Sequence, residues 1–448
     1  MTVLRSTRLE ALLGSTPLTS DALRYHHLEL LVTGQVFEAE DLDYKRELYK
    51  RDDTAKRNLC GDVAALANTR GGILILGADE DDQGRATALP GVDLSDGEAT
   101  RMQQILAGGL APRPPVDIIP VENPAAPGTG CYVIAVAAGP RYPYGVLINN
   151  GYRYPRRVGT TIGYLTEPEI ETAYRRRDAA RRDQAERAGR IEATAISRLD
   201  PAEPWLVMSL VPDQPGESEI NTTTFTHVKN AYQWRSPMIA RDSSRWVRVL
   251  LGQRRYILDA TREHTSIARE MAAELYRDGA GVFAVPATET FSQPDGSSAI
   301  RVSDEKLVIT LLSGVRFLAE HARDRAGASG TAALRASFAH PPVFPVQLLN
   351  GQGLWGLSVI GDKVPLPDIQ PAEAAAPLDD LGDGPGLVST AALLADDLLH
   401  GFGVPESTHI TRSGRILGVQ WWSQEWGRSI VEWALRHHIK VINDSYGR

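Results

Sequence analysis

A helix that leads through paired glycines into a wholly apolar strand constrains this chain more than any other feature. Residues 54–69, TAKRNLCGDVAALANT, place apolar side chains on one helical face and end just before Gly71 and Gly72. The glycines lead into ILILGA, residues 73–78, which has no polar side chain. A strand that is apolar on both faces is normally buried on both sides. The pattern therefore predicts an α/β sheet with this strand in its interior.

Other elements alternate around this strand. Helical patterns occupy residues 21–33, behind Ser20 as a helix cap, and residues 95–109, and a long charged helix is predicted over residues 167–195. Strand patterns occupy residues 42–48, 116–121 and 131–138, and residues 145–157 form a hairpin that reverses at Asn149 to Gly151. The predicted fold class is mixed α/β (α+β).

Length and composition indicate more than one domain. The chain has 448 residues, of which 42% are hydrophobic, and this exceeds one ordinary core. We expect a helical lead-in at residues 1–35, a first domain at 36–195, and a second α/β domain at 200–448. A flexible, exposed connector is expected near residues 365–387, which are rich in Pro, Ala, Asp and Gly.

Charge and cysteine content limit the class of protein. The formal net charge of -8 argues against a generally basic nucleic-acid coat, although a local basic face remains compatible with it. Two cysteines far apart argue against a disulfide framework or a cysteine zinc site. No window approaches eighteen continuous apolar residues, so we expect a cytoplasmic protein without a membrane partner.

Several familiar sites have no counterpart in the sequence. No GxxxxGK[ST] motif occurs, and GGILILG lacks the GxGxxG spacing and opens a strand instead of joining a strand to a helix. No motif therefore supports a nucleotide cofactor. The sequence has no HExxH motif either, which removes the helical zinc site of the metalloproteases.

The stretch FEAEDLDYKREL, residues 37–48, holds many carboxylates for a strand. Strand alternation puts Leu42 and Tyr44 on a face that can pack, and Asp43 and Lys45 on the other face. The second face must meet water, a basic partner or a metal, because an unpaired buried carboxylate is too costly. Glu38 lies at an odd offset from Asp43, so the two converge only if residues 38–41 form a loop or bulge.

A second acidic group, DEDD at residues 79–82, follows the apolar strand. Asp79 or Asp81 could face Asp43 from this neighbouring strand, and three such carboxylates would need a divalent cation. The alternative is that DEDDQG is a hairpin turn, which Asp and Gly favour, and that the first group is a charged strand edge.

The motifs, taken in order, resemble the AlbA-like box of the Schlafen family, in its bacterial single-box form. The series is E-x4-D-Y-K from Glu38, then AALANTRGGILILGADEDDQG, then PGV at 90–92, and finally YRYPRRVGTTIGYLTEPEI. The resemblance spans about residues 30–175 and leaves 200–448 unassigned. It implies a mixed α/β nucleic-acid-binding box, and in the Schlafen nucleases three carboxylates there act with a divalent cation on tRNA-like substrates.

Carried over by motif, the resemblance implies catalytic and metal-binding roles for Glu38, Asp43 and Asp79, with Asp81 as an alternative ligand, and Mn²⁺ or Mg²⁺ as the cation. Asp43 stands where the nucleases have Glu, so its side chain is shorter by one methylene. The nucleases also place two boxes side by side, and this chain has one. A homodimer is therefore expected to supply the second box.

A basic and aromatic segment is the candidate nucleic-acid contact. Arg153, Arg156 and Arg157 are interleaved with Tyr152 and Tyr154, so the arginines are predicted to contact phosphates while a ring stacks on an unpaired base. The competing interpretation is a surface hairpin whose polar groups are already satisfied. Lys45 is predicted to contact phosphate or to compensate charge.

The sequence therefore predicts a nucleic-acid-binding protein, with metal-dependent RNA cleavage as its candidate activity. The first alternative is a non-catalytic DNA-binding regulator whose acids are structural. The second is a protein or ligand interaction module carried by residues 200–448.

Overall fold

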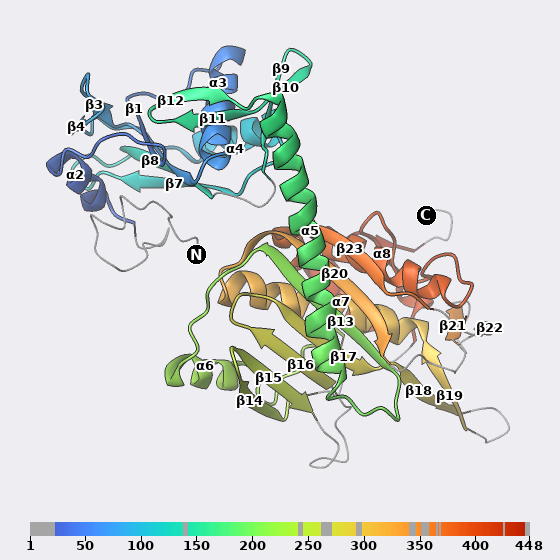
Figure 1. Cartoon of the computed structure of the whole chain (residues 1–448). Helices are drawn as coiled ribbons and strands as arrows, with labels where there is room; N and C mark the ends of the chain where they lie inside the picture. Colours follow the sequence, from blue (N-terminus) through green and yellow to red (C-terminus); the bar gives the residue numbers. More distant parts are fainter. Residues whose placement is uncertain are drawn as a thin grey trace. The chain divides into compact units, whose positions relative to one another are not determined.

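The structure is a computed structural model of the chain, and the residues it describes are 23–137, 142–240, 245–260, 271–292, 298–339, 346–350, 358–363, 366, 369–423 and 426–443 (Figure 1). Residues 1–22, which hold most of the predicted lead-in and its Ser20 cap, lie outside these ranges. The chain divides into two compact units, residues 1–182 and 183–448. The division falls inside one long helix, ahead of the boundary near residue 200 that the sequence suggested.

The first unit contains four helices and twelve strands within its described residues, counting the helix that ends in the second unit. The helices are α2 (Tyr25–Thr33), α3 (Asp53–Ala67), α4 (Asp96–Gly109) and α5 (Glu167–Ile196). The strands are β1 (Leu42–Lys45), β2 (Gly71–Leu76), β3 (Asp79–Glu80), β4 (Ala86–Ala88), β5 (Val92–Asp93), β6 (Leu110–Ala111), β7 (Val116–Glu122), β8 (Thr129–Ala137), β9 (Gly145–Ile148), β10 (Gly151–Arg153), β11 (Pro155–Val158) and β12 (Thr161–Tyr164).

The main sheet of the first unit has the order β1-β2-β8-β5, with β7 also paired to β8. β1 runs parallel to β2, and β8 runs antiparallel to its partners. The predicted interior strand is confirmed: all six residues of β2 are buried. Ile73 and Ile75 pack in the same core as α2, whereas Leu74 and Leu76 pack in the same core as α3 and α4.

The paired glycines have a steric role at the start of β2. Gly72 has φ +146°, and a Cβ atom there would lie 2.4 Å from the carbonyl oxygen of Asp41. Only glycine permits that approach, because no other residue lacks a Cβ atom. The glycine pair therefore lets β2 pair closely with the turn that precedes β1.

The predicted turn and the charged helix are also confirmed, although the hairpin ends at Arg153 and residues 155–158 pair with residues 161–164 instead. Asn149 and Asn150 have φ of 48° and 63° between β9 and β10. The turn signal was therefore correct, since asparagine tolerates positive φ. α5 extends over 30 residues, and Arg175 forms an i,i+4 pair with Glu171. Its second half is less polar than expected from composition: Ala188, Ile191 and Ala195 are buried.

The second unit is built on a seven-stranded antiparallel sheet with the order β14-β15-β16-β17-β13-β20-β23. These strands are β13 (Trp205–Gln214), β14 (Arg248–Gly252), β15 (Arg255–Ala260), β16 (Met271–Tyr276), β17 (Gly281–Pro286), β20 (Ser329–Ala339) and β23 (Ala372–Pro377). A second sheet joins β18 (Thr288–Ser292), β19 (Ser298–Ser303), β21 (Val346–Asn350) and β22 (Ser358–Lys363), and β24 (Ile416–Leu417) pairs with β25 (Val441–Ile442).

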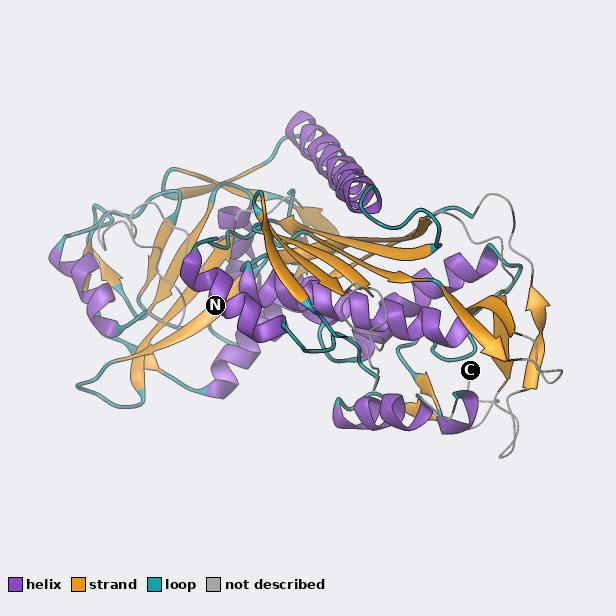
Figure 2. Cartoon of the chain, turned by 90° about the horizontal axis from the view of Figure 1, so that it is seen from below, coloured by secondary structure: helices purple, strands orange, loops and turns teal. Residues whose placement is uncertain are grey.

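Helices cover the seven-stranded sheet unequally on its two faces (Figure 2). The large core contains α6 (Thr222–Tyr232), α7 (Asp304–Glu320), α8 (Pro385–His400) and α9 (Gly427–Arg436), with short helical turns η2 (His321–Arg325), η3 (Leu378–Leu381) and η4 (Val419–Trp421) at its margins. The opposite face carries the second half of α5, which packs on β13 and β17. No described helix has the length and apolar character of a membrane span.

The prediction of a connector near residues 365–387 is wrong from residue 372 onward, where the structure describes the chain. Ala372–Pro377 is the edge strand β23, and Leu378 and Leu381 are fully buried. The composition misled because alternate alanines are small enough to pack beneath α8 at the sheet edge. Farther along the chain, β24 comprises only Ile416–Leu417, and a helical turn follows it.

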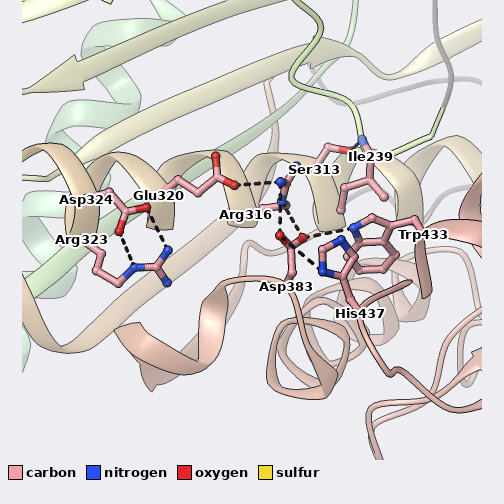
Figure 3. Close-up of polar contacts among 9 residues, drawn as sticks. All are labelled: Ile239, Ser313, Arg316, Glu320, Arg323, Asp324, Asp383, Trp433 and His437. Atoms are coloured by element: carbon pink, nitrogen blue, oxygen red, sulfur yellow. Dashed lines mark hydrogen bonds and ion pairs between the residues drawn. The ribbon is translucent and has the colours of Figure 1, made fainter. Parts of the chain in front are cut away.

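A carboxylate in the same region joins α7 to the C-terminal helix (Figure 3). Asp383 lies 2.7 Å from Arg316 Nε and 3.7 Å from His437 Nδ1, and it accepts a hydrogen bond of 3.1 Å from Trp433 Nε1. Arg316 also pairs with Glu320 at 3.0 Å. The segment that looked like a connector therefore contributes the residue that holds α7 and α9 together.

Candidate functional site

The turn before β1 brings Glu38 to the strand. The odd offset between Glu38 and Asp43 had required such a turn if the two were to converge. Ala39 and Leu42 exchange two backbone hydrogen bonds, so residues 39–42 form a tight turn. The Glu38 carboxylate, at the start of this turn, accepts the backbone N–H of Tyr44 at 2.8 Å. Leu42 and Tyr44 are buried in the core, as strand alternation predicted.

Asp43 lies on the other face of β1 and is 2% exposed. Lys45 Nζ is 3.0 Å and 2.9 Å from its two oxygens, and Arg157 Nη2 is 2.6 Å from Oδ1. Burial alone would raise the pKa of Asp43, but the two cations outweigh burial and lower it. Asp43 is therefore an ionised carboxylate inside an internal charge cluster, and Lys45 compensates its charge.

Arg157 was predicted to contact phosphate, and the structure corrects this role. Its side chain is 3% exposed, it pairs with Asp43, and it donates to the carbonyl oxygen of Thr160 at 2.9 Å. The other two arginines differ. Arg156 is partly exposed and pairs with Glu169 at 2.6 Å, whereas Arg153 lies on the exposed strand β10.

The second acidic group is a hairpin turn, as its alternative interpretation stated. β3 and β4 pair across it, and Asp81 accepts backbone N–H groups of Gln83 and Arg85, each at 2.9 Å. Asp81 also pairs with the Arg85 side chain at 2.7 Å. Asp79 forms an ion pair with Arg46. The structure therefore engages both carboxylates elsewhere and does not gather them with Glu38 and Asp43.

Glu80 is the member of the acidic group that meets Glu38. The pKa of Glu80 is raised, because burial outweighs the opposing effect of its hydrogen bond with Glu38. Burial also raises the pKa of Glu38 from 4.5 to about 8; the Tyr44 N–H opposes this shift, and the Asp43 charge adds to it. A proton shared near these carboxylates relieves their repulsion without a metal.

The residues present do not fit the divalent cation that the resemblance implied. Among the described residues, no group of three His, Cys, Asp or Glu side chains is placed to hold a metal ion. The charge of Asp43 is already balanced by Lys45 and Arg157, so a cation there would meet two positive groups.

A buried acid beside this cluster was missed by sequence reasoning. Asp62, on α3, forms a hydrogen bond with the Tyr49 hydroxyl, and burial raises the pKa of Asp62. Asp43, Lys45 and Arg157 also act electrostatically on it. A polar residue among the apolar positions of α3 was the available signal, because a buried helical carboxylate requires a partner.

Asn68 fastens the end of α3 to the two hairpins that follow β8. Its side-chain amide donates to the carbonyl oxygens of Tyr144 at 2.8 Å and Pro155 at 2.7 Å, and it accepts the Tyr144 N–H at 2.7 Å. Thr69 adds a bond, because its hydroxyl accepts the Arg157 N–H at 2.9 Å. The ANTRGG block therefore positions the hairpins and the guanidinium of Arg157.

Exposed basic and aromatic side chains follow along these hairpins and the start of α5. We define the hairpin surface by six residues that are each exposed: Tyr152, Arg153, Tyr164, Tyr174, Arg175 and Arg176. Tyr154, a predicted contact, lies beneath it: its hydroxyl is 3.0 Å from the Tyr174 hydroxyl, and the two rings meet edge to face. Residues 151–182 contain seven arginines besides the buried Arg157, and only four acidic residues.

Comparison with known proteins identifies a large part of the first unit. The model of the Schlafen, AlbA_2 family matches residues 38–165, which run from the first candidate carboxylate to the end of the second hairpin.

Residues 38–165 form a Schlafen AlbA_2 domain. The remainder of the chain stays unassigned. No curated protein matches the chain. Among solved structures, the DIP2311 protein from Corynebacterium diphtheriae matches at 24% identity and a TM-score of 0.22. The match covers 30% of this chain and 24% of that one, so it spans about a quarter of that protein.

The Glu38 pKa gives the AlbA_2 domain a testable pH dependence. Between pH 4.5 and about 8, folded Glu38 holds a proton that the unfolded chain has released, so stability falls as pH rises through this window. Glu38→Gln keeps the acceptor for Tyr44 and removes the titration. The hydrogen-exchange protection of the β1 amides in the wild type should therefore fall relative to that in Glu38→Gln between pH 5 and 8, measured on the full chain. Parallel pH profiles of the two proteins would contradict the raised pKa.

Proposed function

We infer that the AlbA_2 domain binds nucleic acid through the hairpin surface. The observation that carries this proposal is the coincidence of exposed arginines with exposed tyrosine rings on β10, β12 and the first turns of α5. Guanidinium groups contact phosphates without regard to sequence, and exposed rings stack on unpaired bases. The family association with nucleic-acid binding supports the same conclusion.

This basic surface belongs to a chain whose formal net charge is -8. Acidic surfaces elsewhere repel the phosphate backbone, so binding is confined to the arginine-rich segment. Tyr174 is held in place by Tyr154 and by the Arg177 guanidinium, which lies 4.9 Å from its ring centroid. A ring that is already ordered loses little conformational entropy when a base stacks on it.

The test is a charge-matched comparison of two double variants of the full chain. Arg153→Ala/Arg176→Ala removes two charges from the hairpin surface, and Lys50→Ala/Arg51→Ala removes two exposed charges at the start of α3. Binding to labelled single-stranded RNA, tRNA and duplex DNA is measured over a range of salt concentrations. The first variant should weaken binding and reduce the slope of log K against log salt by up to about 2, and the control should not.

Unchanged affinity and slope in the first variant would contradict binding at this surface. Single-stranded RNA should bind more tightly than duplex DNA, because stacking favours unpaired bases.

Metal-dependent RNA cleavage stays a second candidate, and non-catalytic DNA binding is its rival. Glu38, Asp43 and Glu80 interact with one another, but no three described acids are placed to hold a cation. The full balance of the Asp43 charge favours the second. Incubating the same substrates with Mn²⁺, with Mg²⁺ and with a chelator decides this: product that depends on the cation and is lost in Asp43→Asn supports cleavage, and intact substrate supports binding alone.

A further inference from the structure

The second unit contains a cavity of about 530 Å³ between the last turns of α5 and the seven-stranded sheet. Its volume lies within the range of small-molecule sites in proteins. α5 packs on β13 and β17, and the sheet continues beyond it through β16, β15 and β14 (Figure 1). Ala195, Ala272 and Ala284 line the cavity, and their short side chains leave the space between helix and sheet unfilled.

The walls of the cavity are mostly apolar. Leu199, Leu250, Ile257 and Val282 line it together with the ring of Trp205. Trp205 is fixed, because its indole N–H donates to the carbonyl oxygen of Asp200 at 3.0 Å. A fixed ring beside aliphatic side chains suits a flat or hydrocarbon-rich ligand, because the ring loses little conformational entropy when the ligand packs against it.

Two of the three carboxylates at the cavity are paired with arginines. Glu274 is 2.5 Å from Arg198 Nη2 and 2.9 Å from Arg255 Nε, and it accepts the Tyr276 hydroxyl at 2.9 Å. Asp259 pairs with Arg248.

The remaining acid is Asp200, whose carboxylate accepts the backbone N–H of Ala202 at 2.9 Å. Glu274 and Asp259 therefore have arginine partners, whereas Asp200 is exposed and bonded to a backbone N–H. An anion would meet no unpaired cation among the described lining residues, and a cation would meet only Asp200, which is already exposed to water, so the desolvation of either ion is poorly compensated.

We propose that this cavity binds a small, uncharged and largely apolar molecule. Apolar contact provides the affinity, and the cost of desolvating a charge disfavours ions of either sign. The site lies wholly within the second unit and does not rest on nucleic-acid binding by the first.

A series of three ligands of nearly equal size tests both parts of the proposal. The probes are 2-naphthalenemethanol, 2-naphthoate and 2-naphthylmethylammonium, titrated into the full chain at pH 7 with calorimetric detection. The neutral alcohol should bind saturably at one site, at least about tenfold more tightly than either ion. Tighter or equal binding of an ion would overturn the exclusion of charge, and absence of binding by all three would overturn the site.

Two tryptophan variants locate the binding. Ala272→Trp fills the cavity from β16 and should abolish binding of the alcohol. Leu251→Trp is the matched control, because Leu251 is 54% exposed on β14 and does not line the cavity. Circular dichroism checks that Ala272→Trp retains its sheet, and Ala195→Leu offers the same test from α5 if it does not. Equal binding by Ala272→Trp and the wild type would place the ligand elsewhere.

Discussion

Arg157→Met is expected to destabilise the AlbA_2 domain by about 3–5 kcal/mol, because it leaves Asp43 buried with only Lys45 as its partner. Burying a carboxylate with reduced compensation is among the most costly changes a folded chain can undergo. Hydrogen exchange on the full chain measures the loss locally, since a two-unit protein has no single unfolding midpoint. Protection of the β1 and β2 amides should fall by roughly two to four orders of magnitude.

The double variant Asp43→Leu/Arg157→Met is the control. It removes the carboxylate and the guanidinium together, and Lys45 is exposed enough to reach water. It should therefore be more stable than Arg157→Met alone, as the coupling of a direct pair requires. Asp43→Leu alone completes the cycle, and losses that add would show that the two residues are independent.

A metal titration distinguishes a structural Asp43 from a ligand. With Asp43 paired as described, Asp43→Asn should lower protection by the same factor in Mn²⁺ and in chelator. A wild type that Mn²⁺ stabilises and an Asp43→Asn variant that it does not would restore the metal hypothesis.

Asn68→Ala should cost the AlbA_2 domain about 3 kcal/mol or more, because it leaves two buried carbonyl groups and one N–H without their partner. Asn58→Ala is the matched control, since Asn58 is exposed on the same helix. Exchange of amides in residues 142–158 should rise in Asn68→Ala and stay unchanged in Asn58→Ala. Similar exchange in both variants would mean that α3 does not fasten the hairpins.

Much of the first unit could be predicted because its signals are local. The apolar run of β2, the Asn149–Asn150 turn and the charge pattern of α5 each lie within one short segment. Alternation on β1 also identified the face that needs a basic partner or a metal.

The partners at the site could not be predicted, because they come from distant segments. Any of several arginines could have paired with Asp43, and only the fold places Arg157 beside it. The choice between Asp79 and Glu80 depends on a register shift between those two residues in the β3–β4 hairpin. Such an irregularity changes the face on which a side chain lies, and strand periodicity does not reveal it.

The second unit was harder to predict for a related reason. Alanine-rich segments carry little hydrophobic signal, so β23 resembled a connector, although its pairing with β20 places it in the sheet. The apolar positions in the second half of α5 are separated by charged residues, one of which, Glu192, is itself buried beside Ser337 and Arg335. A partner for that carboxylate exists only once the sheet has formed.

The strand order of the large sheet also determines when this chain can finish folding during its synthesis. β13 is the first strand of its sheet to be made, yet it lies inside the sheet, between β17 and β20. Trp205 pairs with Ala339, so this ladder must wait until the ribosome has released that residue. The first unit comprises residues 1–182, so all of its partner segments leave the ribosome before those of the large sheet. Until then, the apolar side chains of β13, which are buried in the finished sheet, lack the strand β20 beside them.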